Sequence, residues 1–215
     1  MIKPYQREFI EFLLSNQVLK FGEFTLKSGR LSPYFLNLGE FKDGKSLSTL
    51  GHYYAEAIVH HQIKFDLLFG PAYKGIPLAT ATAIALANDF NKNIPYAFNR
   101  KEVKTHGDKG LTVGAPVKGK VLVIDDVITA GTTSREMIQL MQDLKADFSA
   151  MIIAFDRQER GENTQSAVQE LTEKHGIPVY SIVNLSLLIE YLKTEPNIAT
   201  HLEKILDYQK KWGVR

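Results

Sequence analysis

The chain has 215 residues, 44% of them hydrophobic, which is long enough to build one sizeable core. Its 26 basic and 24 acidic residues leave a net charge of +2, so composition indicates neither nucleic acid nor an anionic membrane as a partner. The absence of cysteine excludes disulfides, thiolate nucleophiles and cysteine-ligated metals. We find neither a signal peptide nor an apolar run of ~18 residues, and we therefore expect a soluble, cytoplasmic protein.

The hydrophobic pattern of the first 40 residues predicts a helix followed by a hairpin. Pro4 is suited to the start of the helix, and apolar residues follow it at helical spacing. Two short aromatic-rich runs then flank residues 27–30, as in a β-hairpin. We expect this part of the chain, approximately residues 1–40, to form a small hood beside the core.

From residue 46 onward, helix and strand patterns alternate. The predicted helices span residues 46–61, 76–87, 134–144, 163–176, 184–193 and 196–212, and the predicted strands span residues 65–69, 94–99, 120–125, 148–156 and 178–183. Pro196 is expected to open the last helix. The alternation predicts an α/β fold with a central, mostly parallel sheet flanked by helices. We expect residues 1–215 to form a single domain, with residues 41–215 as its α/β core.

Two adjacent carboxylates, Asp125 and Asp126, follow the apolar strand KVLVI. Ligands of parallel α/β proteins bind at the carboxyl ends of strands, so this position indicates a site. The backbone amides of residues 129–133 open the next helix and can converge on an anion, with threonine hydroxyls as added donors. Because carboxylates repel phosphate and accept from sugar hydroxyls, the peptide suits a ribose 5-phosphate. The alternative is a helix cap alone, which explains single residues but not the whole set.

Other phosphate-binding patterns are absent from the sequence. Neither a Walker loop nor a G-x-G-x-x-G dinucleotide fingerprint occurs. A receiver domain also has an acidic pair after an apolar strand, but its pair lies near the start of the fold and lacks the Thr-Ala-Gly-Thr-Thr turn found here.

Residues 121–133 resemble the phosphoribosyl pyrophosphate (PRPP) binding motif of type I phosphoribosyltransferases. Four other segments, FTLKSGRLSPYF, GPAYKGIPLA, NRKEVKTHG and FDRQER, resemble those of orotate phosphoribosyltransferases in their order, and the resemblance covers nearly the whole chain. It implies the type I fold. It also implies Mg²⁺-dependent transfer of the 5-phosphoribosyl group from PRPP to orotate, giving orotidine 5'-monophosphate and pyrophosphate in pyrimidine synthesis.

The PRPP side of the site combines three segments. Lys74, in a flexible turn after a predicted strand, could meet the departing pyrophosphate, or it could be a solvated loop lysine. Residues 100–110 are cationic and glycine-containing, which is typical of a mobile lid but also of a solvated surface. With the motif at residues 125–133, the PRPP contacts that the resemblance implies are Tyr73, Lys74, Arg100, Lys101, Lys104, His106, Asp125, Asp126, Val127, Ile128, Thr129, Ala130, Gly131, Thr132 and Thr133.

The resemblance also assigns roles within this set. It implies a homodimer in which the 100–110 loop reaches the neighbouring active site, so that Lys101 acts in trans. The catalytic residues would be Lys101, Lys104, His106, Asp125 and Asp126, with His106 either a proton donor or a phosphate contact. No residue is assigned as a certain metal ligand. Mg²⁺ would be held mainly by PRPP, pyrophosphate and water, near the acidic pair.

The base site needs a cation, because orotate carries a carboxylate. Arg157, directly after the strand FSAMIIAFD, offers a planar fork, and Lys27 could provide a second cation. Orotate contacts implied by the resemblance also include Tyr34, Phe35 and Thr129. Asp156 is left outside the site as a possible ion-pair partner of Arg157.

Two other functions remain open at this stage. A PRPP-sensing regulator should carry a DNA-binding segment or a strongly basic face, and neither is visible in the sequence. A transferase for a purine or for uracil would have no use for carboxylate-binding cations at positions 157 and 27.

Overall fold

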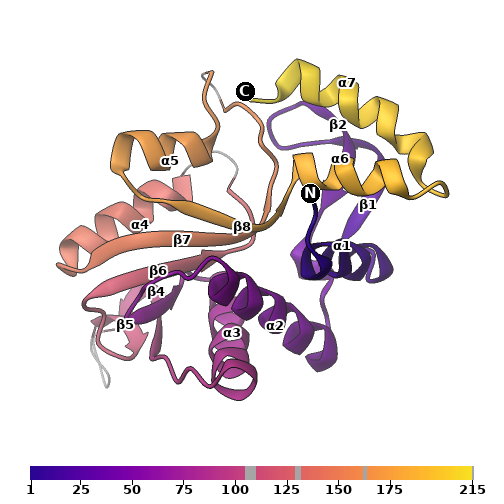
Figure 1. The fold of residues 1–215 in the computed structure, drawn as a ribbon. Helices are drawn as coiled ribbons and strands as arrows, with labels where there is room; N and C mark the ends of the chain where they lie inside the picture. The colour runs from indigo at the N-terminus through magenta and orange to yellow at the C-terminus, as the bar shows by residue number, and fades with distance from the viewer. Residues whose placement is uncertain (105–109, 129–131, 162–163, 215) are drawn as a thin grey trace.

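The computed structural model describes residues 1–104, 110–128, 132–161 and 164–214 (Figure 1). Its strands are β1 (Leu19–Thr25), β2 (Leu31–Leu36), β3 (Leu67–Gly70), β4 (Tyr96–Lys104), β5 (Gly110–Gly114), β6 (Lys120–Asp125), β7 (Asp147–Asp156) and β8 (Val179–Asn184). Its helices are α1 (Pro4–Ser15), α2 (Gly44–His60), α3 (Gly75–Phe90), α4 (Thr132–Asp143), α5 (Ala167–His175), α6 (Leu185–Thr194) and α7 (Leu202–Trp212), with short 3-10 turns η1 (Leu38–Glu40) and η2 (Ala199–His201).

The central sheet has six strands in the order β5-β4-β3-β6-β7-β8. All its pairings are parallel except that of β5 with β4. The predicted mostly parallel sheet is therefore confirmed. Residues 110–114, for which the sequence predicted no strand, form the edge strand β5, and residues 100–104 of the predicted lid belong to β4. Beyond Phe98, β4 no longer pairs with β3, and its only strand partner in the described chain is β5.

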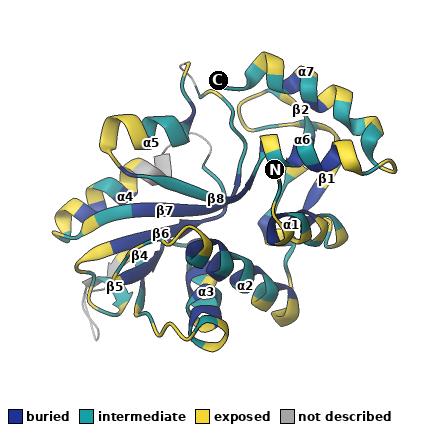
Figure 2. Cartoon of the chain, in the orientation of Figure 1, coloured by how far each residue is buried: buried dark blue, intermediate teal, exposed yellow. Residues whose placement is uncertain are grey.

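The sheet is covered on both faces, because its strands carry apolar side chains in both directions. In β6, Val121 and Val123 belong to the cluster that includes α4 residues, whereas Leu122 and Ile124 belong to the cluster that includes α2 and α3 residues. Alternation along a strand produces this division. Figure 1 shows α4 and α5 on one face and α2 and α3 on the other, and Figure 2 shows the buried strands between them.

The strand order changes direction between β3 and β6. The chain leaves β3 through α3 to β4 on one side, and leaves β6 through α4 to β7 on the other. Two neighbouring strands thus send their next helices to opposite faces. In open α/β sheets, ligands bind at the carboxyl ends of the strands where the order changes direction in this way.

The first 40 residues form α1 and the antiparallel β1-β2 hairpin, as the sequence predicted. Their buried side chains, such as Phe9 and Tyr34, belong to the same apolar cluster as Leu68 and Ile182 of the central sheet. Helix α7 lies against β2 and covers this end of the molecule (Figure 1). The interpretation of residues 1–215 as one domain with a hood stays a prediction, which the shared cluster supports.

Two predicted helix starts are wrong. Pro196 does not open the last helix; it occupies the second position of a turn in which the amide of Ile198 donates to the carbonyl of Glu195 at 3.2 Å, and α7 begins at Leu202. Helix α5 begins at Ala167, because the Ser166 side chain caps it by accepting from the Gln169 amide. Among the helices of the described residues, none has the length and apolarity needed to cross a membrane.

Candidate active site

The acidic pair lies at the carboxyl end of β6 and is buried, each residue being 8% exposed. Local hydrogen bonds fix both carboxylates: the amide of Asp126 donates to Asp125 Oδ1 at 2.9 Å, and the amide of Val127 donates to Asp126 Oδ1 at 2.8 Å. The backbone is held as well. The Tyr54 hydroxyl of α2 donates to the Asp125 carbonyl at 2.8 Å, and the Ala154 amide of β7 donates to the Asp126 carbonyl at 3.0 Å.

Burial gives Asp125 an unusual titration. It raises the pKa of this carboxyl from its ordinary value of 3.8 to about 7, and the neighbouring Asp126 charge adds to the shift. The ionised form of Asp125 is therefore costly in the protein alone. Donors on a bound sugar would stabilise that ionised form.

Asp125→Asn should therefore change how stability depends on pH. A carboxyl whose pKa is raised on folding binds more protons in the folded state, so its stabilising contribution is complete below the unfolded pKa near 3.8 and is lost as pH rises through about 7. Asparagine cannot ionise. Relative to the wild type, we expect the variant to gain on the order of 2–3 kcal/mol in free energy of unfolding between pH 5 and pH 8. Urea denaturation at both pH values measures this, and an equal difference at both would contradict it.

Lys74 joins the acidic pair from the neighbouring strand. It lies between β3 and α3, and its Nζ is 2.6 Å from Asp126 Oδ2. The side chain is 60% exposed, so this ion pair is open to solvent and can exchange partners. The sequence raised pyrophosphate binding and plain solvation as readings of Lys74; the structure adds a direct contact with the ribose-binding candidates.

The turn that carries Lys74 is closely packed. A Cβ on Gly70 would collide with the Gly75 carbonyl oxygen and with Ala79, so glycine is required for this approach. The amides of Ala72 and Gly75 already donate to Asn99 Oδ1 at 2.8 Å and to the Pro71 carbonyl at 2.9 Å. In the described chain, the amides of Tyr73 and Lys74 form no such bond and remain able to donate to an anion.

Lys101 lies on the part of β4 that extends past β3. Its side chain is exposed, and its Nζ is 5.8 Å from the centroid of the Tyr73 ring, which is itself 71% exposed. Arg100 is partly exposed. Lys101 therefore borders the turn at residues 70–75.

Several predicted contacts fall outside the described residues. His106, Thr129, Ala130 and Gly131 are among these, and so are the side chains of Lys104, Thr132 and Thr133. Thr132 and Thr133 lie in the first turn of α4, and Val127 and Ile128 connect the acidic pair to it, both partly exposed.

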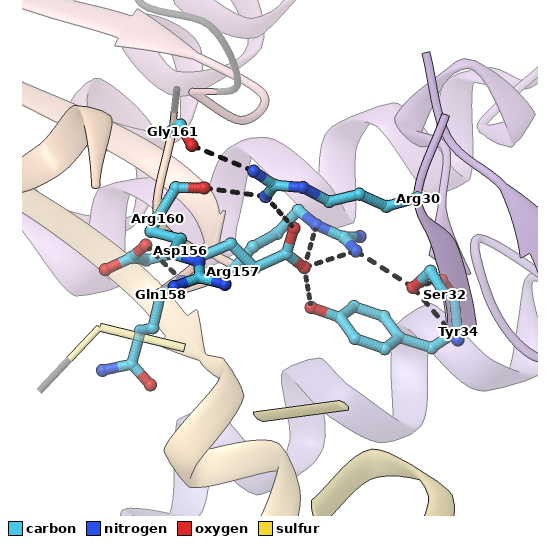
Figure 3. A network of polar contacts seen from close by, with 9 residues as sticks. Arg30, Ser32, Tyr34, Asp156, Arg157, Gln158, Arg160 and Gly161 are labelled. Carbon is cyan, nitrogen blue, oxygen red and sulfur yellow. Dashed lines mark hydrogen bonds and ion pairs between the residues drawn. The ribbon is translucent and has the colours of Figure 1, made fainter. Parts of the chain in front are cut away.

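The base side of the candidate site centres on Arg157, just after β7 (Figure 3). Its guanidinium lies over the Tyr34 ring, 4.2 Å from the centroid, and Nη2 donates to the Ser32 hydroxyl at 3.1 Å. Tyr34 is fully buried, and burial raises the pKa of its phenol well above the ordinary value. The structure thus brings Arg157 and Tyr34 together, as the sequence proposed for orotate.

Phe35 and Lys27 lie apart from this contact. Phe35 points to the other side of β2, 37% exposed, and stacks on Phe24 with centroids 5.4 Å apart. Lys27 is exposed in the hairpin turn and forms no hydrogen bond or ion pair with described residues.

Asp156 is not the ion-pair partner of Arg157. Its Oδ1 instead accepts from the Gln158 amide at 2.9 Å, whereas Arg157 Nη2 lies 2.6 Å from Glu159 Oε1. Successive side chains at the end of a strand point in opposite directions, so the adjacent carboxylate is badly placed for pairing. Sequence reasoning missed Glu159 and Ser32. The signal for Glu159 was an acid two positions after the predicted carboxylate-binding arginine. Nothing in the local sequence indicated Ser32.

Comparison with known proteins adds independent findings. The model of the phosphoribosyl transferase domain matches residues 38–183. The orotate phosphoribosyltransferase of Klebsiella pneumoniae (strain 342) is 54% identical over 99% of this chain and 100% of the relative, and that of Salmonella typhi is equally similar.

Solved structures agree with this. The orotate phosphoribosyltransferase of Francisella tularensis superposes with a TM-score of 0.88 and 45% identity, covering 96% of this chain and 99% of the other. Leishmania donovani UMP synthase matches at a TM-score of 0.74 and 25% identity, with 42% of its chain covered. The fold, the position of the acidic pair and these full-length relatives together show that the chain belongs to the orotate phosphoribosyltransferase family.

Proposed function

We propose that the protein transfers the 5-phosphoribosyl group of PRPP to orotate, giving orotidine 5'-monophosphate and pyrophosphate in pyrimidine synthesis. The observation that carries this most directly is the buried pair Asp125 and Asp126, joined to Lys74 of the adjacent strand's turn. Family membership supports the same reaction. Arg157 lies at the end of β7, next to β6, so a base held there and a sugar held by the acidic pair would meet at one edge of the sheet.

The reaction replaces one bond to the anomeric carbon with another. The bond from C1 to the pyrophosphate oxygen breaks and its electron pair leaves with pyrophosphate, while orotate N1 supplies the electron pair of the new bond and releases its proton to water. Positive charge develops on the ribose ring as this happens, as in glycoside cleavage. No protein nucleophile is needed.

We assign residues of the chain to the two parts of PRPP, the ribose 5-phosphate and the leaving pyrophosphate. Asp125 and Asp126 would accept hydrogen bonds from the ribose hydroxyls, and the amides of residues 129–133 would hold the 5-phosphate. Lys74, Lys101, Lys104 and His106 would stabilise the negative charge that accumulates on pyrophosphate. When a sugar is bound, Lys74 would exchange Asp126 for the pyrophosphate. For His106, phosphate contact and proton donation both stay open.

Mg²⁺ fits the residues present as a partner of the substrate. Among the described residues there is no cluster of three or more potential metal-binding side chains, but the acidic pair offers two carboxylates, and Mg²⁺ typically binds one or two carboxylates together with phosphates. Bound there, Mg²⁺ would neutralise charge on the leaving group.

We further propose that the protein is a homodimer in which the 100–110 loop crosses the interface. Tyr73 and Ile84, before and within α3, are large apolar side chains that are 71% and 57% exposed, and a partner subunit would cover them. Lys101 is exposed beside Tyr73. A cytoplasmic location stays a prediction.

The decisive experiment incubates the purified protein with PRPP, Mg²⁺ and orotate while orotate absorbance and pyrophosphate are followed. We expect orotate and pyrophosphate to change in equal amounts, with no reaction when PRPP is omitted. Parallel reactions with uracil, adenine and hypoxanthine should release far less pyrophosphate. Consumption of a purine or uracil in preference to orotate would overturn the proposal, and so would PRPP binding with no turnover of any base.

A further inference from the structure

Glu159 contacts two arginines, Arg157 and Arg30, both of which belong to the polar network in Figure 3. Its Oε1 accepts from Arg157 Nε at 2.8 Å and from the Tyr34 hydroxyl at 3.2 Å, and its Oε2 lies 3.9 Å from Arg30 Nη1. The side chains of Glu159, Arg157 and Arg30 are only 11%, 10% and 16% exposed. In such a poorly solvated place, charge-assisted hydrogen bonds hold geometry much better than they do at the surface.

Hydrogen bonds of the preceding residue, Gln158, fix the backbone that carries Glu159. Gln158 has a φ of 51°, a left-handed conformation that a residue with a side chain adopts at a cost. Asp156 Oδ1 accepts from its amide, and the amide and hydroxyl of Ser186 donate to its Oε1 at 2.9 and 2.7 Å. The Val214 amide donates to its carbonyl at 2.9 Å. These bonds fix the turn, and the turn places the Glu159 carboxylate against Arg157.

The hood binds the same loop from the opposite side. Arg30, at the end of the hairpin turn, donates to the carbonyls of Arg160 and Gly161 at 2.7 and 2.9 Å, and its guanidinium lies 4.4 Å from the centroid of the Trp212 ring. The Trp212 carbonyl accepts from the Arg160 amide at 2.9 Å. The loop is therefore held between the hood and the end of α7, so Glu159 has a fixed frame.

As a result, the guanidinium of Arg157 is bound along one edge. Glu159 accepts a hydrogen bond from Arg157 Nε and forms an ion pair with Nη2. Nη2 also donates to the Ser32 hydroxyl, and the Tyr34 ring covers one face of the guanidinium. Across the described parts of the chain, Nη1 donates no hydrogen bond. A guanidinium held in this way keeps the N–H groups of Nη1 as donors, which suits an oxygen of an anionic or carbonyl-bearing ligand.

We infer that Glu159 is a positioning residue for the base: it holds Arg157 so that Nη1 faces orotate, and it thereby sets orotate affinity. This rests on the proposed function. Glu159 forms no hydrogen bond or ion pair with Lys74, Asp125 or Asp126 within the described residues. Its role is therefore separable from PRPP binding, and a change at Glu159 should affect one substrate selectively.

Glu159→Gln tests this, because glutamine keeps the shape but loses the charge. We expect KM for orotate to rise about tenfold, the loss typical of a hydrogen bond to a charged group, while KM for PRPP and kcat stay within about twofold. In the reverse direction, KM for orotidine 5'-monophosphate should rise and KM for pyrophosphate should not. Glu170→Gln, which removes a partly exposed carboxylate on α5, is the matched control and should change none of these values.

The outcomes separate this inference from the proposed function. If the wild type consumes no orotate, both fail. If the wild type is active but Glu159→Gln leaves orotate KM unchanged, lowers it, or raises the KM of both substrates equally, only the positioning role is overturned. Thermal melting identifies a variant that does not fold. In that case Glu159→Asp, which keeps the charge but shortens its reach, must show the same selective rise in orotate KM, and a uniform effect would reject the inference.

Discussion

Replacing Asp126 with asparagine will lower kcat/KM for PRPP by about 10²–10³-fold, because two charge-assisted contacts are lost together. The carboxylate is the proposed acceptor for a ribose hydroxyl, and its Oδ2 also holds Lys74 at 2.6 Å. The amide side chain can still accept from the Val127 amide, which donates to Oδ1 at 2.8 Å in the wild type. Local structure should therefore survive while sugar binding and the placement of Lys74 are impaired. Steady-state kinetics with varied PRPP measures the effect.

Asp207→Asn is the matched control for this experiment. Asp207 is a 68% exposed carboxylate on α7 that pairs with Lys210 within the same helix, so its neutralisation should change activity little. An Asp126→Asn protein that melts like the wild type and keeps its kcat/KM for PRPP would remove the acidic pair from the proposed sugar site.

Mixing two inactive variants should restore activity if Lys101 acts across a dimer. Lys101→Ala chains keep their acids, and chains with Asp125→Ala and Asp126→Ala keep their lysine. A mixed dimer then has one complete site, so random pairing of equal amounts should give about a quarter of wild-type activity. Each variant alone should be nearly inactive, because Lys101 is proposed to stabilise the leaving pyrophosphate.

The alternative is a role for Lys101 within its own subunit, where its Nζ is 5.8 Å from the Tyr73 ring centroid. In that case, one site of each mixed dimer would lack the lysine and the other would lack the acids, so mixing would restore no activity. Co-expression with two different affinity tags and sequential purification isolates mixed dimers, which proves that subunits have paired. Inactive mixed dimers would reject action in trans.

Segments whose structure depends on local sequence were predicted well. Strand β6 spans residues 120–125, as its unbroken apolar run and terminal acids predicted, and the hairpin at residues 19–36 follows from aromatic runs around a turn. The parallel α/β class followed from the alternation of such segments. These features depend on periodicity and turn chemistry, which the sequence displays directly.

Segments that depend on distant partners were predicted less well. Residues 110–114 form a strand because β4 extends past β3 and offers them an edge, and glycine-rich sequence gives no sign of that. Likewise, Arg157 pairs with Glu159 and not with the adjacent Asp156, because the left-handed turn at Gln158 returns the later carboxylate.

The sequence by itself determined the class of fold, the acidic pair at the end of β6 and the identity of the cations around it, since each is a local pattern of residue types. Only the tertiary structure decided which of these groups meet. Lys74 reaches Asp126 because β3 and β6 are neighbours in the sheet, and Arg157 is gripped because the hood, β7 and α7 converge on one loop. Such contacts join residues as far apart as 32 and 157, and they are set by strand order and packing, which no local stretch of sequence specifies.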